Sequence, residues 1–194
     1  MDDLDRSDSS VWEVLKGALI LPFSPLRGFT ALHHNASILS AVLVGIAFPM
    51  IWGLASMVNG GWVHPPGQSL VVYFARSSVH AILFLLLLVV FSAVFVRRGP
   101  KTRADYASNA RLIGYWYAWQ FSLTSVGGLV WHDGHFQLIF GLLLFAWFAW
   151  LLAVALSVAN DVALRRCLIP GICALFCSAV VSSWLGLLGW FAPF

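Results

Sequence analysis

The sequence predicts an all-α fold, a polytopic bundle of five transmembrane helices preceded by an amphipathic interfacial helix. Three observations predict it. Hydrophobic residues make up 60% of the 194 positions and charged residues only 10%, too little charge to cover a soluble domain. The mean hydropathy is +0.86. Apolar stretches longer than the ~20 residues that cross a bilayer recur along the chain.

The amino-terminal part divides into an acidic tail and an amphipathic segment. Residues 1–10 carry four Asp and one Arg, so we expect a disordered acidic tail. The spacing of Ser10 and Glu13 is that of a capping box, which predicts that a helix starts there. Residues 11–35 then form the amphipathic interfacial segment.

Apolar side chains gather on one side of this first helix, opposite Glu13, Lys16 and Gly17. Pro22 and Pro25 stop it, so it is too short to span a bilayer. Two placements remain open. The helix lies along the membrane surface, or it packs against the bundle.

Residues 36–194 form the predicted transmembrane domain. Turn-forming or basic stretches such as NGGWVHPPGQS and RRGPKTR separate its apolar segments. The five predicted spans cover residues 36–58, 70–96, 107–131, 136–160 and 168–191.

Basic residues predict the orientation of the chain. Ten of the eleven Lys and Arg residues fall in the amino-terminal segment, in 97–111 or at 165–166, and only Arg76 falls on the other side. Cytoplasmic loops carry this excess. We expect an integral membrane protein with a cytoplasmic amino terminus and an outside carboxyl terminus.

Small residues at helical spacing predict the surfaces through which the spans pack. Lipid provides no hydrophobic drive between helices, so small residues that permit close approach matter most. They are scarce in the second span, which we expect to be the most exposed to lipid. The predicted packing residues are Gly45, Gly53, Gly114, Ala118, Ala153, Ala174, Ser178, Ser182 and Gly186.

Two polar groupings are candidate sites. Arg76 and His80 are four residues apart in the second span and could share a polar cavity with Gln120. The alternative is that Arg76 extends toward phosphates and His80 makes one hydrogen bond within the bundle.

On the outer side, His64, His132 and His135 are candidate zinc or copper ligands, provided that two loops meet. Otherwise these histidines are ordinary loop residues.

Several function classes lack support in the sequence. No Asp or Glu lies inside a predicted span, and the chain has no GxSxG, HExxH or P-loop motif. We therefore predict that it is not an enzyme and that it uses no cofactor. We also expect no nucleic-acid binding, because no extramembrane domain carries a basic face.

One family pattern matches much of the chain. WEVLKGALILPFSPLRGF precedes the first span, RRGPKTR leads into a polar opening at Asn109–Tyr115, and the fourth span carries Trp147 and Trp150 before a polar turn. This layout resembles the bacterial branch of the Yip family, five-span membrane proteins. The resemblance implies a cytoplasmic amino terminus and a bacterial inner (cytoplasmic) membrane, and it is the eukaryotic members that it implies act through partner proteins. The Asp-Leu-Tyr-Gly-Pro motif of the eukaryotic members is absent.

The leading functional hypothesis is a non-catalytic membrane scaffold or accessory subunit. It would act in the lipid bilayer through helix contacts with another membrane protein or with itself. The first alternative is a small transporter or lipid-handling protein with a polar cavity at Arg76 and His80. The second is an outer-face metal or redox-cofactor protein that uses His64, His132 and His135.

Overall fold

The computed structural model describes residues 2–47, 70–96, 106–130 and 134–187. All regular structure within these ranges is helical, and they contain no strand. The helices are α1 (Asp2–Ile20), α2 (Pro25–Asn35), a short helix Ile38–Ala47, α4 (Leu70–Phe95), α5 (Tyr106–Val130), α6 (Gly134–Asn160) and α7 (Leu168–Leu187), with a 3₁₀ turn at Leu164–Arg166 before α7.

Three of the described helices are long and apolar enough to cross a membrane, as expected of an integral membrane protein. The qualifying segments are Ser78–Phe95, Ile139–Asn160 and Leu164–Ser182. The 25 residues of α5 are also long enough, but they include Asn109, Arg111 and Gln120. Of the first predicted span, the described part is Ile38–Ala47.

The amino-terminal segment forms a helical hairpin rather than one interfacial helix. We expected a disordered tail over 1–10, whereas α1 begins at Asp2; the acidic residues of its first turn suit the positive end of the helix dipole. We also expected Pro25 to stop a helix. It instead starts α2, after Ser24 as the N-cap residue, because the fixed φ of proline suits the first turn of a helix.

Glycine sets the distance between the two arms of this hairpin. A Cβ added at Gly28 would lie 2.8 Å from Leu21 Cα and 2.9 Å from the Gly17 carbonyl oxygen. Gly17, expected on the polar side of α1, therefore faces α2. The structure shows α1 packed against α2, and a position of α1 along the membrane surface stays a prediction.

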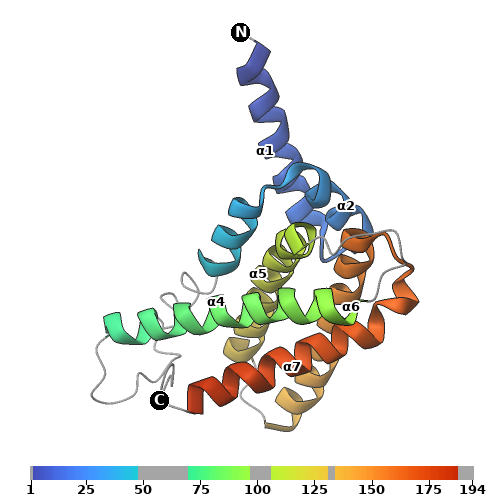
Figure 1. The fold of residues 1–194 in the computed structure, drawn as a ribbon. Coiled ribbons are helices and arrows are strands. Elements are labelled where there is room, and N and C mark those ends of the chain that lie inside the picture. Colours follow the sequence, from blue (N-terminus) through green and yellow to red (C-terminus); the bar gives the residue numbers. More distant parts are fainter. Residues whose placement is uncertain (1, 48–69, 97–105, 131–133, 188–194) are drawn as a thin grey trace.

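The four long helices form two antiparallel pairs. Figure 1 shows α5 and α6 side by side, with α4 and α7 running together across them. The second predicted span, α4, is the most exposed of the three apolar helices: 17% of Ser78–Phe95 is buried, against 44% of Ile139–Asn160. In Figure 1, the α1–α2 hairpin covers the end of the bundle where α5 begins.

A Schellman turn ends α6. Asp161 has a φ of 50°, a left-handed conformation that Asp tolerates better than most residues. The Val162 N–H donates to the Ser157 carbonyl at 3.1 Å, and the Ser157 hydroxyl donates to the Val162 carbonyl at 2.6 Å. The first bond satisfies a carbonyl that the end of α6 leaves unpaired, and the two bonds together hold the turn that leads toward α7.

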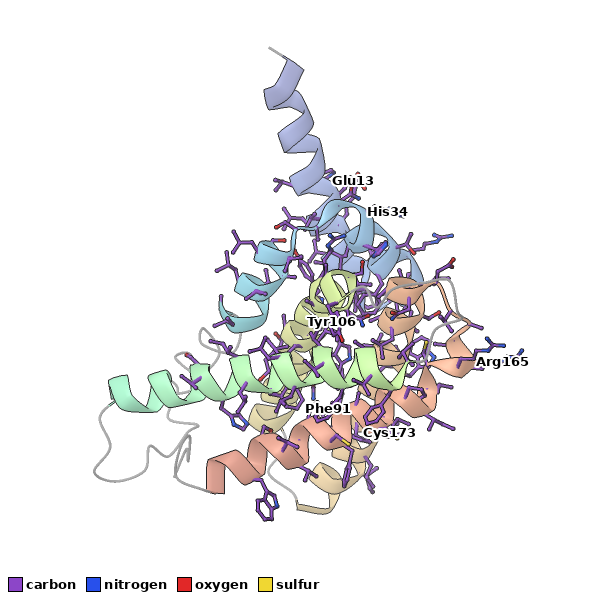
Figure 2. All side chains as sticks on the ribbon, in the orientation of Figure 1. Glu13, His34, Phe91, Tyr106, Arg165 and Cys173 are labelled. Atoms are coloured by element: carbon purple, nitrogen blue, oxygen red, sulfur yellow. The ribbon has the colours of Figure 1, made fainter. Side chains whose placement is uncertain are left out.

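Side chains fill the spaces between the helices in Figure 2. Trp116 and Phe148 are among the largest fully buried side chains. Large apolar side chains on α6 and α7 instead point outward; examples are Leu142 (63% exposed) and Phe176 (67%).

Gly114→Ala should destabilise the protein by about 1–3 kcal/mol, because the added methyl group would meet backbone atoms that cannot move aside. A Cβ there would lie 2.4 Å from the Ala41 carbonyl oxygen. The free energy of unfolding in mixed detergent micelles measures this effect. Gly141→Ala in α6 is the matched control, since nothing lies within 4 Å of the added group. Equal stability of the two variants would contradict the assignment of a close contact at Gly114.

Candidate functional site

The inner face of α5 packs against several neighbouring elements. Its buried residues meet α2 of the amino-terminal hairpin, α4 and α6, and at Gly114 the Ile38–Ala47 helix. They include Leu112, Ile113, Gly114, Tyr115, Trp116 and Ala118.

Two glycines bring α5 against the Ile38–Ala47 helix. A Cβ added at Gly45 would lie 3.2 Å from the Gly114 carbonyl oxygen, and one added at Gly114 would overlap the Ala41 carbonyl. The backbones are therefore in direct contact. Such contact lets dispersion forces act along the whole crossing, which holds helices together where lipid is the surrounding medium.

Hydrogen bonds from α5 satisfy carbonyls at the ends of the hairpin helices. Trp119 Nε1 donates to the Ala18 carbonyl at 2.8 Å. Within α1 that carbonyl would accept from residue 22, but Pro22 has no N–H. The Arg111 guanidinium donates to the His33 carbonyl in the last turn of α2, where a cation also suits the helix dipole.

Two further bonds tie α5 to α6. The buried Trp116 Nε1 donates to the Phe148 carbonyl at 2.9 Å, and its ring meets the Phe148 ring edge-on at 6.4 Å between centroids. The Asn160 side-chain amide donates to the Asn109 side-chain oxygen at 2.9 Å, with both residues buried. Replacing one partner would leave the other polar group buried without its hydrogen bond. Each pair therefore favours this arrangement of α5 and α6.

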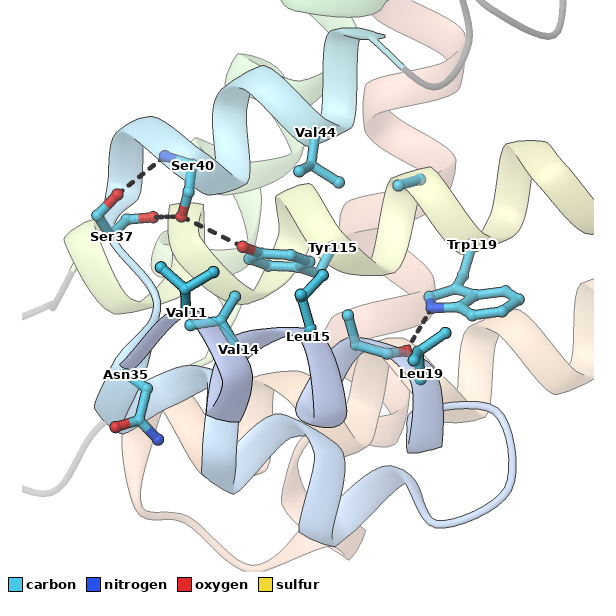
Figure 3. A pocket seen from close by; sticks show the side chains of 12 residues that line it. Val11, Val14, Leu15, Leu19, Asn35, Ser37, Ser40, Val44, Tyr115 and Trp119 are labelled. Carbon is cyan, nitrogen blue, oxygen red and sulfur yellow. Dashed lines mark hydrogen bonds between the residues drawn. The ribbon is translucent and has the colours of Figure 1, made fainter. Parts of the chain in front are cut away.

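A pocket of about 530 Å³ lies between α1, the Ile38–Ala47 helix and α5. Figure 3 shows its two ends. Asn35, Ser37 and Ser40 lie at one end, and Leu19 and Trp119 lie at the other. Apolar side chains fill most of the wall: Val11, Val14, Leu15, Ala18, Leu19, Val44, Ala118 and Trp119.

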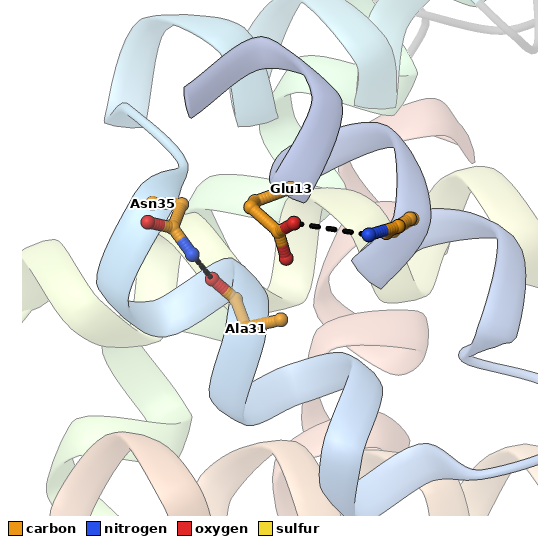
Figure 4. A network of polar contacts seen from close by, with 4 residues as sticks. Glu13, Ala31 and Asn35 are labelled. Carbon is orange, nitrogen blue, oxygen red and sulfur yellow. Dashed lines mark hydrogen bonds and ion pairs between the residues drawn. The ribbon is translucent and has the colours of Figure 1, made fainter. Parts of the chain in front are cut away.

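Each arm of the hairpin carries one polar contact within its own helix (Figure 4). Lys16 and Glu13 pair at 3.1 Å on the exposed side of α1, and Lys16 also lies 5.7 Å from the Trp12 ring centroid. The Asn35 side-chain amide donates to the Ala31 carbonyl at 2.9 Å. An exposed ion pair contributes little stability, so this face is solvated rather than structural.

The other predicted packing residues lie on several surfaces. Ala118 is buried and lines the pocket. A Cβ added at Gly171 of α7 would lie 3.9 Å from the Ala153 backbone of α6. Ala174, Ser178 and Ser182 are buried along one stripe of α7. Gly53 lies outside the described residues, and Gly186 lies in α7 at a position whose surroundings are outside them.

The structure does not bring Arg76, His80 and Gln120 together in a described cavity. All three lie on helices, His80 and Arg76 on α4 and Gln120 on α5. His80 and Gln120 are both partly buried, whereas the side chain of Arg76 is outside the described part. None of the three lines the 530 Å³ pocket. A polar cavity at these residues stays a prediction.

The predicted metal ligands fall largely outside the described part of the chain. His64 and His132 lie in the ranges 48–69 and 131–133, and His135 lies in the first turn of α6 with its side chain not described. In the remainder, no three His, Cys, Asp or Glu residues form a group that could hold a metal ion.

The residues that hold the hairpin and α6 to α5 were not predicted individually. Arg111 entered the sequence analysis only as one of the basic residues of 97–111, and Trp116 and Trp119 were not singled out. The sequence does contain one indication of these helix contacts. The polar residues Asn109, Arg111 and Gln120 interrupt a largely apolar helix. A polar group inside a bundle needs a partner, so each interruption points to a contact between helices.

Comparison with models of known protein families, with characterised proteins and with solved structures finds no match to this chain.

Trp119→Phe should loosen α1 while leaving the α5–α6 pair intact, because it keeps an aromatic ring but removes the donor to the Ala18 carbonyl. A lost hydrogen bond costs about 0.5–1.5 kcal/mol, so amide exchange in residues 11–20 should accelerate roughly two- to tenfold. Hydrogen-exchange mass spectrometry measures it. Trp184→Phe, at a 66% exposed position of α7, is the control, and equal exchange in both variants would contradict the role of Trp119.

Proposed function

We propose that this chain is a non-catalytic membrane scaffold or accessory subunit that acts through helix contacts with another membrane protein or with a second copy of itself. One observation carries the proposal. The polar side chains on the inner face of α5 bind other helices: Arg111, Tyr115, Trp116 and Trp119 each donate a hydrogen bond to an atom of another helix.

These contacts support a structural role because they engage polar side chains that chemistry within the membrane would need to keep available. In proteins that move ions or activate water, polar side chains at membrane depth face a cavity or a substrate path. On α5, the two indole N–H groups and the guanidinium are engaged with backbone carbonyls. The result is a rigid body that can present its outer faces to a partner.

The outer faces of α6 and α7 are the proposed contact surfaces. On α7, large exposed side chains recur at helical spacing opposite the buried stripe of Ala174, Ser178 and Ser182. They are Ile169, Ile172, Phe176, Val180 and Trp184. Aromatic anchors of this kind dominate interface energetics where they occur.

We further propose five spans in a bacterial inner membrane, with the amino terminus cytoplasmic, and a relationship to the bacterial Yip-like proteins. Support for this orientation comes from contacts near the ends of α2, α5 and α6. Arg111 reaches α2, and the Asn109–Asn160 bond joins the start of α5 to the end of α6. The basic residues near these ends therefore belong to one side of the protein, as the positive-inside rule requires.

Extraction in a mild detergent should yield either a discrete oligomer or a stoichiometric partner. Phe176→Ala on α7 and Leu142→Ala on α6 test the two outer faces separately. Loss of an interface anchor costs more than about 1 kcal/mol, so one of the two should weaken the association at least roughly fivefold in quantitative co-purification. A wild-type protein that remains a lone monomer would rule out the scaffold role.

A reporter fused to either end tests the orientation. Alkaline phosphatase is active only outside the cytoplasm, and green fluorescent protein exported unfolded through the Sec translocon does not fluoresce there. We expect fluorescence from the amino-terminal fusion and phosphatase activity from the carboxyl-terminal fusion, since an odd number of spans separates the ends. Both ends reporting the same side would contradict five spans.

A further inference from the structure

We propose that the pocket between α1, the Ile38–Ala47 helix and α5 holds one acyl chain of a membrane phospholipid. The glycerol end of the lipid would lie at Asn35, Ser37 and Ser40. This inference is independent of the scaffold role, because it concerns the pocket between α1, the Ile38–Ala47 helix and α5 and not the outer faces of α6 and α7.

The polarity of the pocket changes from one end to the other, as an amphiphile requires. Ser37 and Ser40 lie at one end, and Leu19 and Trp119 lie at the other (Figure 3). Its volume of about 530 Å³ lies in the range of ~300–1,000 Å³ typical of sites for small molecules. The second described pocket, between the Ile38–Ala47 helix, α4 and α5, has only about 80 Å³.

The polar atoms along the walls are already engaged with the protein. Trp119 Nε1 donates to the Ala18 carbonyl, and the Tyr115 hydroxyl donates to Ser40 Oγ at 3.2 Å. Ser40 Oγ in turn donates to the Ser37 carbonyl at 2.8 Å. The apolar end therefore suits a hydrocarbon and not a polar solute, since a polar ligand there would lose its hydrogen bonds to water.

The polar end, at Asn35, Ser37 and Ser40, offers donors to a lipid ester or hydroxyl. Ser37 Oγ accepts from the Ser40 N–H at 2.9 Å, which leaves the hydroxyl hydrogen of Ser37 to donate outward. Asn35 carries a second amide hydrogen beside the one bonded to Ala31. These groups are uncharged, so they suit the glycerol ester region better than a phosphate.

The surroundings of the pocket indicate what kind of molecule would occupy it. α1 carries Trp12 and Lys16, which lie together on its exposed side, a combination that favours the headgroup level of a bilayer. Val11, Leu15 and Leu19 of the same helix line the pocket yet are 58%, 49% and 63% exposed. Apolar cavities exclude water and accept apolar guests, and acyl chains are the abundant apolar guests of a membrane.

Photolabelling of the reconstituted full-length protein tests the proposal. The vesicles contain phosphatidylethanolamine and phosphatidylglycerol with a trace of phosphatidylethanolamine that carries a diazirine at the end of one acyl chain. Mass spectrometry of peptides should place labels on Leu19 and Trp119, well above those on the outward Leu142 and Phe176. Labels spread evenly over all exposed apolar residues would overturn the proposal, as would labelling by a diazirine free fatty acid but not by the phospholipid.

Adjacent positions on the Ile38–Ala47 helix give a matched pair of variants. Val44→Trp fills the pocket, whereas Leu43, which is 57% exposed, does not line it. Val44→Trp should reduce labelling of α1 about tenfold because the indole occupies the volume of the chain, and Leu43→Trp should leave it unchanged. Leu15→Trp, at a half-exposed pocket position, gives the same test should Val44→Trp not fold. Undiminished labelling in a folded pocket variant would refute the site.

Discussion

No side chain fits between α5 and the Ile38–Ala47 helix at Gly114, and the arrangement of the neighbouring helices depends on this contact. The Ala41 carbonyl occupies the space where a Cβ would stand. Because the two backbones touch there, Tyr115 on the next position of α5 comes within hydrogen-bonding distance of Ser40. The contact thereby also fixes one wall of the pocket.

A second constraint is the unpaired carbonyl that proline creates in α1. Pro22 removes the N–H that the Ala18 carbonyl would use, and an indole from α5 replaces it. In an apolar medium an unsatisfied carbonyl is expensive, so the end of α1 is stable where Trp119 can reach it. The residue that terminates the helix also determines where the helix docks.

Most of the helix positions could be predicted from apolar length alone. The predicted spans over 70–96, 107–131 and 136–160 correspond to α4, α5 and α6 to within two residues at each end, because hydrophobic runs bounded by Gly, Pro and charged residues leave little freedom. The packing between the helices was harder to predict from the sequence than their positions. Spacing of small residues marks Gly45 and Gly114 but not the fact that they meet, since this depends on how helices distant in sequence cross. α2 was missed because Pro25 was interpreted only as a helix stop, although proline also suits the first turn of a helix.

The candidate site was harder to predict for the same reason. Trp116 and Trp119 look like the other tryptophans of an aromatic-rich chain, and only their partners distinguish them. The partners lie far away along the chain, in α6 and α1. A single sequence contains the donors and acceptors but not their pairing.

The bond between Trp119 and Ala18 joins residues 101 positions apart, and this separation has a consequence for biosynthesis. At a ribosomal rate of about 5–20 residues per second, roughly 5–20 s pass between the synthesis of α1 and that of its docking surface. During that interval the nascent amino-terminal hairpin exists without α5, and its apolar residues have no folded protein to meet. The first helix made therefore reaches its final place only after α5, the helix on which it docks, has been synthesised.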